Sequence, residues 1–102
     1  MSTKTVYVSI GNSDNKLPQA EWYYFACEVK IVAEMYSRAW HGTWSSETLS
    51  AYQNAVFCFE VHPAHVETAK DRLRELATRY GQDSIAWAEA ETEFLVPLPG
   101  LT

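Results

Sequence analysis

The chain has 102 residues, of which 47% are hydrophobic and 14% aromatic, and its net charge is −5 at pH 7. This length and composition predict one folded domain with a single core and exclude a disordered chain. The acidic balance argues against non-specific nucleic-acid binding, which depends on Lys and Arg neutralising phosphates. No segment is apolar enough for a signal peptide or a membrane span, so we expect no membrane partner.

The first half of the chain predicts a strand, a long helix and a short strand. Residues 5–10 alternate apolar and polar positions, as in a half-buried strand. From Pro18, which suits the first helical position, apolar residues recur at three- and four-residue spacings as far as Trp40. Gly42 ends this pattern, and a short strand is predicted over 43–46.

The second half repeats the order of strand, helix and strand. Residues 54–61 alternate in the same way as the first strand. Pro63 opens a second amphipathic helix, and Gly81 supplies its C-terminal cap. A last strand is predicted over 84–96, and residues 97–102 form a tail.

The element order β-α-β-β-α-β predicts an α+β fold of the ferredoxin-like, split βαβ type. In this fold a four-stranded antiparallel sheet carries two helices on one face. We expect one ferredoxin-like domain over residues 1–96. The alternation places Phe57 and Phe59 on the helix side, and the open face is acidic, so an RNA-recognition sheet is not predicted.

This topology brings three polar connections, 11–17, 47–54 and 81–84, to the same pole of the domain. Amides, hydroxyls, one cation and a tyrosine ring suit a polar small molecule such as a nucleotide. The predicted ligand-binding residues are Asn12, Ser13, Asp14, Lys16, Tyr52, Gln53, Asn54, Gln82, Asp83 and Ser84. The alternative is that these are ordinary turn residues, because surface turns favour the same types.

Metal binding and catalysis have weaker support in the sequence. His41, His62 and His65 gather at the opposite pole, with Glu60 or Glu67 as a further ligand, but their spacing is loose. We therefore assign no metal and no cofactor.

An enzyme remains an alternative, with Asp14 and Asp83 as a carboxylate pair for acid–base chemistry. The two cysteines, Cys27 and Cys58, fall inside predicted helix and strand. This position predicts reduced thiols and a cytoplasmic protein, and no Cys–His nucleophile pair is indicated.

The first helix carries a second apolar stripe opposite its buried one. Tyr24, Cys27, Ile31 and Met35 recur at helical spacing. Trp87 is expected on the open face of the sheet. Because a helix on a sheet needs only one buried face, these five residues predict an interface, most simply that of a two-fold homodimer.

The phrases "VYVSIGNSDNKL", "YQNAVFCFEV" and "QDSIAWA" resemble those of small uncharacterised proteins from actinobacteria and their phages. The resemblance covers most of the chain and implies a small accessory protein. Two anti-defence roles follow from it as expectations: sequestering a host nucleotide signal, or inhibiting a host protein by direct binding.

The leading hypothesis is a cytoplasmic, oligomeric domain that binds a nucleotide-like ligand at the loop pole without transforming it. The alternative is a protein-interaction module that acts through the outer stripe of the first helix.

Overall fold

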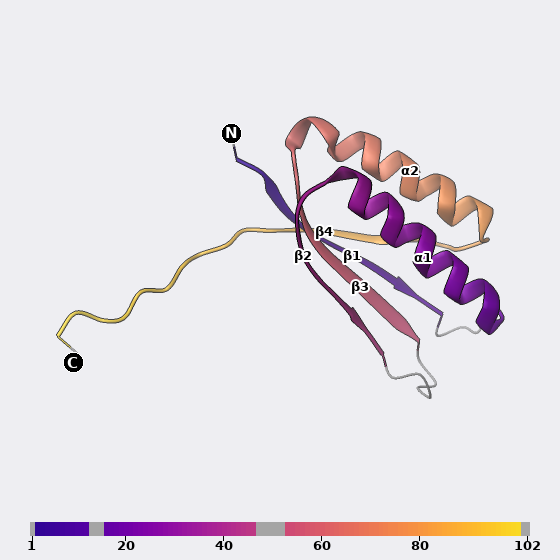
Figure 1. Cartoon of the computed structure of the whole chain (residues 1–102), viewed down its shortest axis with the longest axis horizontal. Coiled ribbons are helices and arrows are strands. Elements are labelled where there is room, and N and C mark those ends of the chain that lie inside the picture. The colour runs from indigo at the N-terminus through magenta and orange to yellow at the C-terminus, as the bar shows by residue number, and fades with distance from the viewer. Residues whose placement is uncertain (1, 13–15, 47–52, 101–102) are drawn as a thin grey trace.

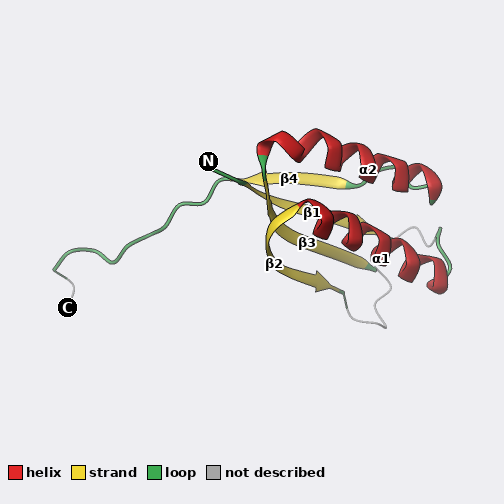
Figure 2. Ribbon diagram, turned by 45° about the horizontal axis from the view of Figure 1, so that its top comes forward, coloured by secondary structure: helices red, strands yellow, loops and turns green. Residues whose placement is uncertain are grey.

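The computed structural model describes residues 2–12, 16–46 and 53–100, and it has two α-helices packed on a four-stranded sheet (Figure 1). Along the chain the elements are β1 (Lys4–Gly11), α1 (Gln19–Tyr36), β2 (Ser37–Ser45), β3 (Asn54–Val61), the short 3₁₀ turn η1 (Pro63–His65), α2 (Val66–Arg79) and β4 (Ala86–Ala90). The strand order is β2-β3-β1-β4, and all neighbouring strands are antiparallel. Both helices cover the same face of the sheet (Figure 2). The predicted ferredoxin-like α+β fold is confirmed.

The central pair of strands, β1 and β3, forms the floor of the core. Val6 lies opposite Phe59 and Val8 lies opposite Phe57, so these four side chains point to one face. Each of them has at most 2% of its surface exposed. The alternation seen in the sequence therefore gives the face that the helices cover.

Helix α1 covers this floor with residues that recur every four positions. Phe25, Val29 and Ala33 are buried, and Phe25 has no exposed surface. The Phe25 ring lies 5.0 Å from the ring of Tyr80, which follows α2. Leu73 of α2 belongs to the same cluster, so one core joins both helices to the sheet.

The predicted end of the first helix is wrong by four residues. Helix α1 ends at Tyr36, and the backbone becomes extended at Ser37 (φ −79°, ψ 133°). Trp40, predicted in the helix, lies in β2 and stacks on Phe59 at 5.8 Å between ring centroids. The four-residue step to Trp40 fits a helix, but pairing along the whole of β3 favours an extended chain. The second strand is consequently nine residues long rather than a short strand over 43–46.

The last strand also differs from its prediction in length and in the side it presents. It ends at Ala90, whereas alternation predicted a strand up to residue 96. Trp87 lies opposite the buried Val8, and its ring meets Phe59 edge-on at 6.3 Å. The expected exposure of Trp87 on the open face is therefore wrong. Because alternate residues of this strand are Ala, the sequence allows either set of side chains to face the helices. The register with β1 decides which set does so.

Phe25→Ala is expected to lower the free energy of unfolding by about 3–5 kcal/mol, because it leaves a cavity between both helices and the sheet. The matched control is Tyr24→Ala, which truncates the neighbouring, 61% exposed ring and should change stability by less than about 0.5 kcal/mol. Urea denaturation measures both changes. Equal losses in the two variants would contradict this description of the core.

Candidate functional site

The loop before α1 is closed by Asn12, which is only 2% exposed. Its side-chain amide donates to the Leu17 carbonyl (2.9 Å) and to Oε1 of Gln53 (3.0 Å). The Leu17 N–H in turn donates to Oδ1 of Asn12 (3.0 Å). A buried amide with these partners holds the loop in place. The Asn12 side chain therefore fixes the connection between β1 and α1 and is not available to a ligand.

Other residues predicted at this pole also bond to each other. Lys16 lies 3.2 Å from Asp83, although both side chains are largely exposed, so the pair stabilises the fold little. Gln53 exchanges two hydrogen bonds with Gln19 of α1 (2.7 and 3.0 Å). Asn54 begins β3, and its backbone N–H donates to the Ser46 hydroxyl. Ser13, Asp14 and Tyr52 lie outside the described residues, and so does the Asp14 half of the predicted Asp14–Asp83 carboxylate pair.

The connection Gln82–Ser84 lies between two hollows of the surface. On the side of the open sheet face it borders a hollow of about 340 Å³, together with Gly11 and Asn54. On the helix side it borders a cleft of about 530 Å³ between α2 and β4. Of the predicted residues, Gln82, Asp83 and Ser84 border both hollows, and Asn54 borders the one on the open side of the sheet.

The walls of the α2–β4 cleft differ in chemistry. Lys70 and Arg74 line it from α2, while Ile85 and Trp87 line it from the chain entering β4 and from β4 itself. The Lys70 ammonium lies 5.5 Å from the centroid of the Trp87 ring, a cation–π distance. The cleft exists because α2 packs mainly on α1 and leaves the edge strand β4 partly uncovered. It combines cations, an indole ring and a polar end formed by the 82–84 connection.

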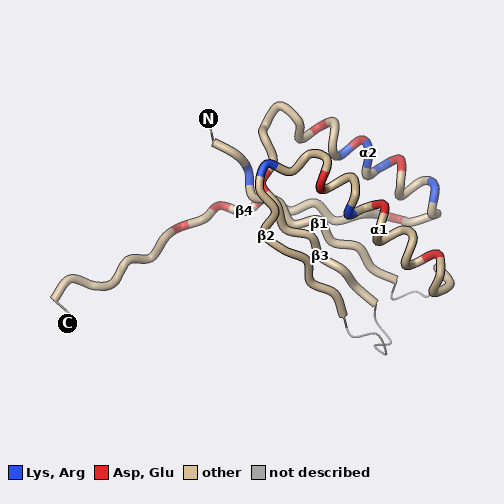
Figure 3. Tube along the Cα trace, in the orientation of Figure 1, with Lys and Arg blue, Asp and Glu red and all other residues tan. Residues whose placement is uncertain are grey.

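The two cations of the cleft pair with exposed acids of α2 itself, while Asp83 lines the same cleft and Lys70 also lowers the pKa of Glu89 on β4. Arg74 pairs with Asp71 at 2.7 Å, and Lys70 pairs with Glu67 at 3.5 Å. Asp71 and Glu67 have side chains that are 70% and 77% exposed, so both pairs are weak. The alternation of charge along α2 is visible in Figure 3. Because both pairs are weak, a bound anion can compete with Asp71 and Glu67 for the two cations.

The indole is fixed from its other edge by an acid on the same strand. The Trp87 Nε1–H donates to Glu89 at 3.0 Å, and Lys4 pairs with Glu89 at 3.4 Å. The bond from Trp87 lowers the pKa of Glu89 more than any other cause, Lys4 lowers it further, and partial burial opposes both. Glu89 thus stays ionised and holds the ring in one orientation.

The sequence analysis missed the cations of this cleft. The charged side of an amphipathic helix ordinarily faces solvent, but the Lys70 side chain is only 27% exposed. Lys70, Arg74 and Thr78 are four residues apart, next to the buried seam that includes Leu73. Cationic residues at four-residue spacing beside a buried apolar seam were the signal in the sequence. That signal pointed to a binding cleft only when the structure placed Trp87 opposite them.

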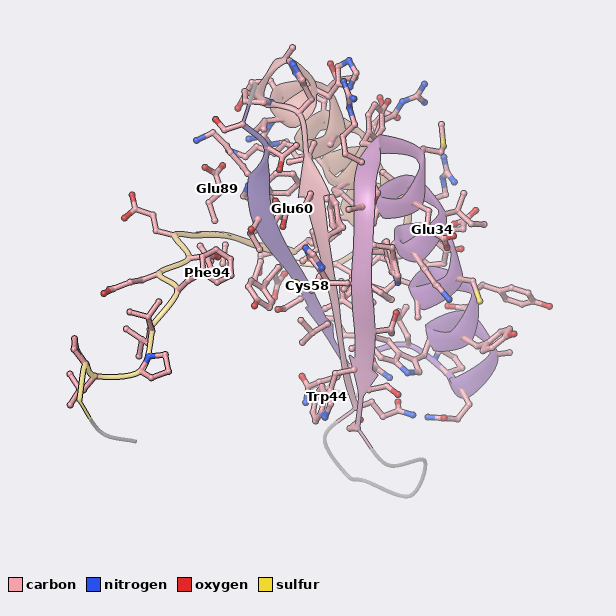
Figure 4. The ribbon with its side chains drawn as sticks, turned by 60° about the vertical axis from the view of Figure 1, so that its left-hand side comes forward. Glu34, Trp44, Cys58, Glu60, Glu89 and Phe94 are labelled. Carbon is pink, nitrogen blue, oxygen red and sulfur yellow. The ribbon has the colours of Figure 1, made fainter. Side chains whose placement is uncertain are left out.

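The open face of the sheet holds a second polar group around Glu60. This carboxylate accepts hydrogen bonds from the Thr3 hydroxyl (2.7 Å) and the Thr5 hydroxyl (2.6 Å), and His41 Nε2 lies 2.7 Å away. The Thr5 bond lowers the pKa of Glu60 most, Thr3 and His41 lower it further, and burial acts against them. The side of the sheet that carries Glu60 and Cys58 is seen in Figure 4.

The remaining histidines lie beside η1, where His62 and His65 have ring centroids 5.8 Å apart. His62 Nδ1 accepts the Ala64 N–H and so caps the 3₁₀ turn. Over residues 2–12, 16–46 and 53–100, no three His, Cys, Asp or Glu side chains form a group that could hold a metal ion.

The predicted outer stripe of α1 lies on the surface. Tyr24, Ile31 and Met35 are 61%, 56% and 65% exposed, and Cys27 between them is half-buried with a free thiol. Tyr23 extends the stripe, with its ring 6.1 Å from that of Tyr24. Neither helix in the described part of the chain is long and apolar enough to cross a lipid bilayer.

Comparison with known proteins supports the fold and goes no further. No protein-family model and no curated protein matches the chain. The C-terminal domain of the MgtC protein from Mycobacterium tuberculosis is similar in structure, with a TM-score of 0.58 and 12% identity over 88% of this chain and 90% of that one. A candidate monooxygenase from Shewanella loihica gives a TM-score of 0.43 and 13% identity over 95% and 99% of the two chains. The first likeness shows the fold alone, and the second is too low to carry an argument.

Thr5→Val is expected to lower the free energy of unfolding at pH 7 by about 1 kcal/mol, because it removes a hydrogen bond to an ionised carboxylate. Since the folded pKa of Glu60 is lowered, this contribution is complete above the ordinary glutamate pKa of about 4.3 and is lost as the pH falls through the folded value. Urea denaturation at several pH values measures the difference between variant and parent.

The control for this prediction is Thr43→Val, which makes the same change at an exposed position of β2. Its effect should not depend on pH. A loss in Thr5→Val that stays constant down to strongly acidic pH would show that the Glu60 carboxylate is not its cause.

Proposed function

We propose that this chain is a small ligand-binding protein that holds an anionic, ring-containing metabolite, such as a nucleoside monophosphate, in the α2–β4 cleft without transforming it. The observation that carries the proposal is the pairing of two cations with an indole ring across a cleft of about 530 Å³. The proposal keeps the nucleotide-like ligand predicted from the sequence. It moves the ligand from the loop pole to the helix side of the 82–84 connection.

The anionic group of the ligand belongs beside α2. Lys70 and Arg74 are one helical turn apart on the same side of this helix, so both can reach one phosphate or carboxylate. Arg presents a planar fork of donors and Lys a compact charge, a combination that suits phosphate oxygens. Their present partners, Asp71 and Glu67, are solvated and compete weakly.

The ring of the ligand belongs beside Trp87. Stacking on an aromatic side chain contributes about 1–3 kcal/mol for a nucleic-acid base and needs no particular hydrogen-bond pattern. The Lys70 ammonium now lies over the indole. We infer that it swings toward the anionic group when a flat ring takes its place.

The polar end of the cleft gives orientation. Gln82 offers a carboxamide, Ser84 a hydroxyl and Asp83 a carboxylate, which together can bond to the edge of a base or to a sugar. This role needs no catalytic group, and we assign none. Sequestration of a nucleotide signal, one role implied by the sequence resemblance, requires only such binding.

Lys70→Ala is expected to weaken binding of adenosine monophosphate about tenfold, the size expected for one charge-assisted hydrogen bond. Isothermal titration calorimetry of the full chain measures the dissociation constant. Adenosine and inorganic phosphate, titrated separately, should each bind more weakly than the monophosphate, because each engages only one wall of the cleft.

Arg72→Ala is the matched control, since it removes a cation from the same helix that does not line the cleft. Its dissociation constant should stay within about twofold of the parent value. No binding of the monophosphate by the parent, or equal losses in both variants, would overturn the proposal for this cleft.

A second candidate function is protein binding through the outer stripe of α1, defined as Tyr24, Cys27, Ile31 and Met35. The observation that favours it is the exposure of three of these side chains on a helix whose other face already fills the core. Contiguous apolar surface of this kind marks interaction sites in soluble proteins. We propose a second copy of the chain as the partner of this stripe.

Ile31→Glu is expected to lower the average mass of the protein in sedimentation equilibrium, because it places a charge in the centre of the stripe. Lys30→Glu is the matched control on the same helix, where the parent residue is already charged and exposed. The control should keep the parent's mass. A mass that is the same in all three proteins would exclude the stripe as a self-association surface.

A further inference from the structure

The segment that follows β4 exposes an apolar run to solvent. Its large side chains are Phe94, Leu95, Val96 and Leu98, which are 86%, 84%, 79% and 70% exposed. The segment runs away from the helices and the sheet (Figure 1). The radius of gyration of the chain is 16.1 Å, above the value of about 13 Å that a compact domain of this length would have. Four adjoining apolar side chains held in water in this way need a partner surface.

The course of the backbone keeps these side chains from the sheet of their own chain. Strand β4 ends at Ala90, and residues 91–93 are Glu, Thr and Glu, none of which is a strong turn former. Residues 91–98 form no helix, strand or turn, and the first turn of the segment is at Pro99 and Gly100. The chain therefore continues outward past residues 94–98 before any tight reversal.

The sheet has a face that can receive such a segment. On the side opposite the helices, Tyr7 and Trp44 are 41% and 59% exposed, and Val56 and Cys58 are half-buried between them. The register places Tyr7 opposite Cys58, and Val56 opposite Trp44, so they form one continuous apolar patch across three strands. Figure 4 shows Trp44 and Cys58 on this side and Phe94 on the segment that leaves the sheet.

We propose that two copies of the chain form a two-fold dimer in which residues 94–98 of each copy dock on the open sheet face of the other, over Tyr7, Trp44, Val56 and Cys58. Two-fold symmetry makes the exchange reciprocal, so both segments and both faces are covered at once. At about 100 Å² per apolar side chain, the six side chains that can face the patch (three from each copy) and the surface they cover bury about 1,200 Å², the lower end of the range for specific, stable interfaces.

The residues of the segment favour docking on the face of a sheet over pairing with its edge strand. Pro97 has no N–H to donate, so the segment cannot extend a sheet along its full length. In an extended chain Phe94, Val96 and Leu98 share one side, which can lie flat on an apolar patch. The two acids of the segment, Glu91 and Glu93, precede the apolar run and are exposed, so docking of the run leaves them in solvent.

The test measures assembly in the Ile31→Glu background, so that the outer stripe of α1 cannot contribute. Sedimentation equilibrium of this protein should give twice the monomer mass of 11.6 kDa. Adding Phe94→Asp with Val96→Asp should raise the dimer dissociation constant about a hundredfold, because two charges enter an apolar interface. Adding Tyr7→Ser should weaken the dimer through the receiving face. Thr92→Asp is the control, since it adds a charge to the same segment outside the apolar run.

A dimer that is weakened by the segment variant and by Tyr7→Ser, but not by Thr92→Asp, supports the proposal. Three results would overturn it: a monomer in the Ile31→Glu background, a dimer that survives the segment variant, or a dimer indifferent to Tyr7→Ser. Circular dichroism checks that each variant is folded, and Val96→Asp alone replaces the double variant if that one unfolds. Because the measurement uses no ligand, it succeeds or fails independently of nucleotide binding in the α2–β4 cleft.

Discussion

The pairing of β1 with β3 is the constraint on which the rest of the molecule depends. Eight opposed residue pairs fix the register and place Val6, Val8, Phe57 and Phe59 on one face. Burial of that face stabilises the fold, and two amphipathic helices are enough to cover it. The other face then receives no cover from the helices, and the edge strand β4 is only partly covered. The ligand cleft and the proposed docking patch both follow from this one-sided burial.

The cleft arises from the way the second helix satisfies its own apolar seam. Helix α2 buries Leu73 and Leu76 toward the core and packs on α1, so its flank with Lys70 and Arg74 overhangs β4. The Lys70 ammonium lies over the Trp87 ring, and the Lys70 side chain remains partly exposed to water. An anion-binding wall and an aromatic wall thereby face each other without any special loop.

The ligand cleft and the docking patch lie on opposite sides of the sheet. The cleft lies on the helix side of β4, whereas the patch around Tyr7 and Cys58 lies on the uncovered side. A ligand and a second copy can therefore bind together. Strand β4 links the two sites, because it carries Trp87 into the cleft and leads outward to residues 94–98.

Local pattern was enough to predict the architecture from the sequence. Alternation predicts the strands over 5–10 and 54–61, and the spacing after Pro18 predicts the first helix. Both predictions work because a strand or helix must bury its apolar side. The same argument predicted the exposed stripe of α1. Tyr24 and Ile31 lie on the side of the helix opposite the residues that are buried in the core.

Pairing between distant segments decided the rest. The step to Trp40 fits both helix and strand, and only the partner β3 selects the strand. The side that Trp87 presents depends on its register with β1, and hence so does the existence of a cleft opposite Lys70. At the loop pole, Asn12 looked available to a ligand, but the fold uses its amide to close the chain on Leu17. Sequence determines which groups a chain can offer, whereas tertiary contacts determine which of them are already bonded and which remain for a ligand or a second copy.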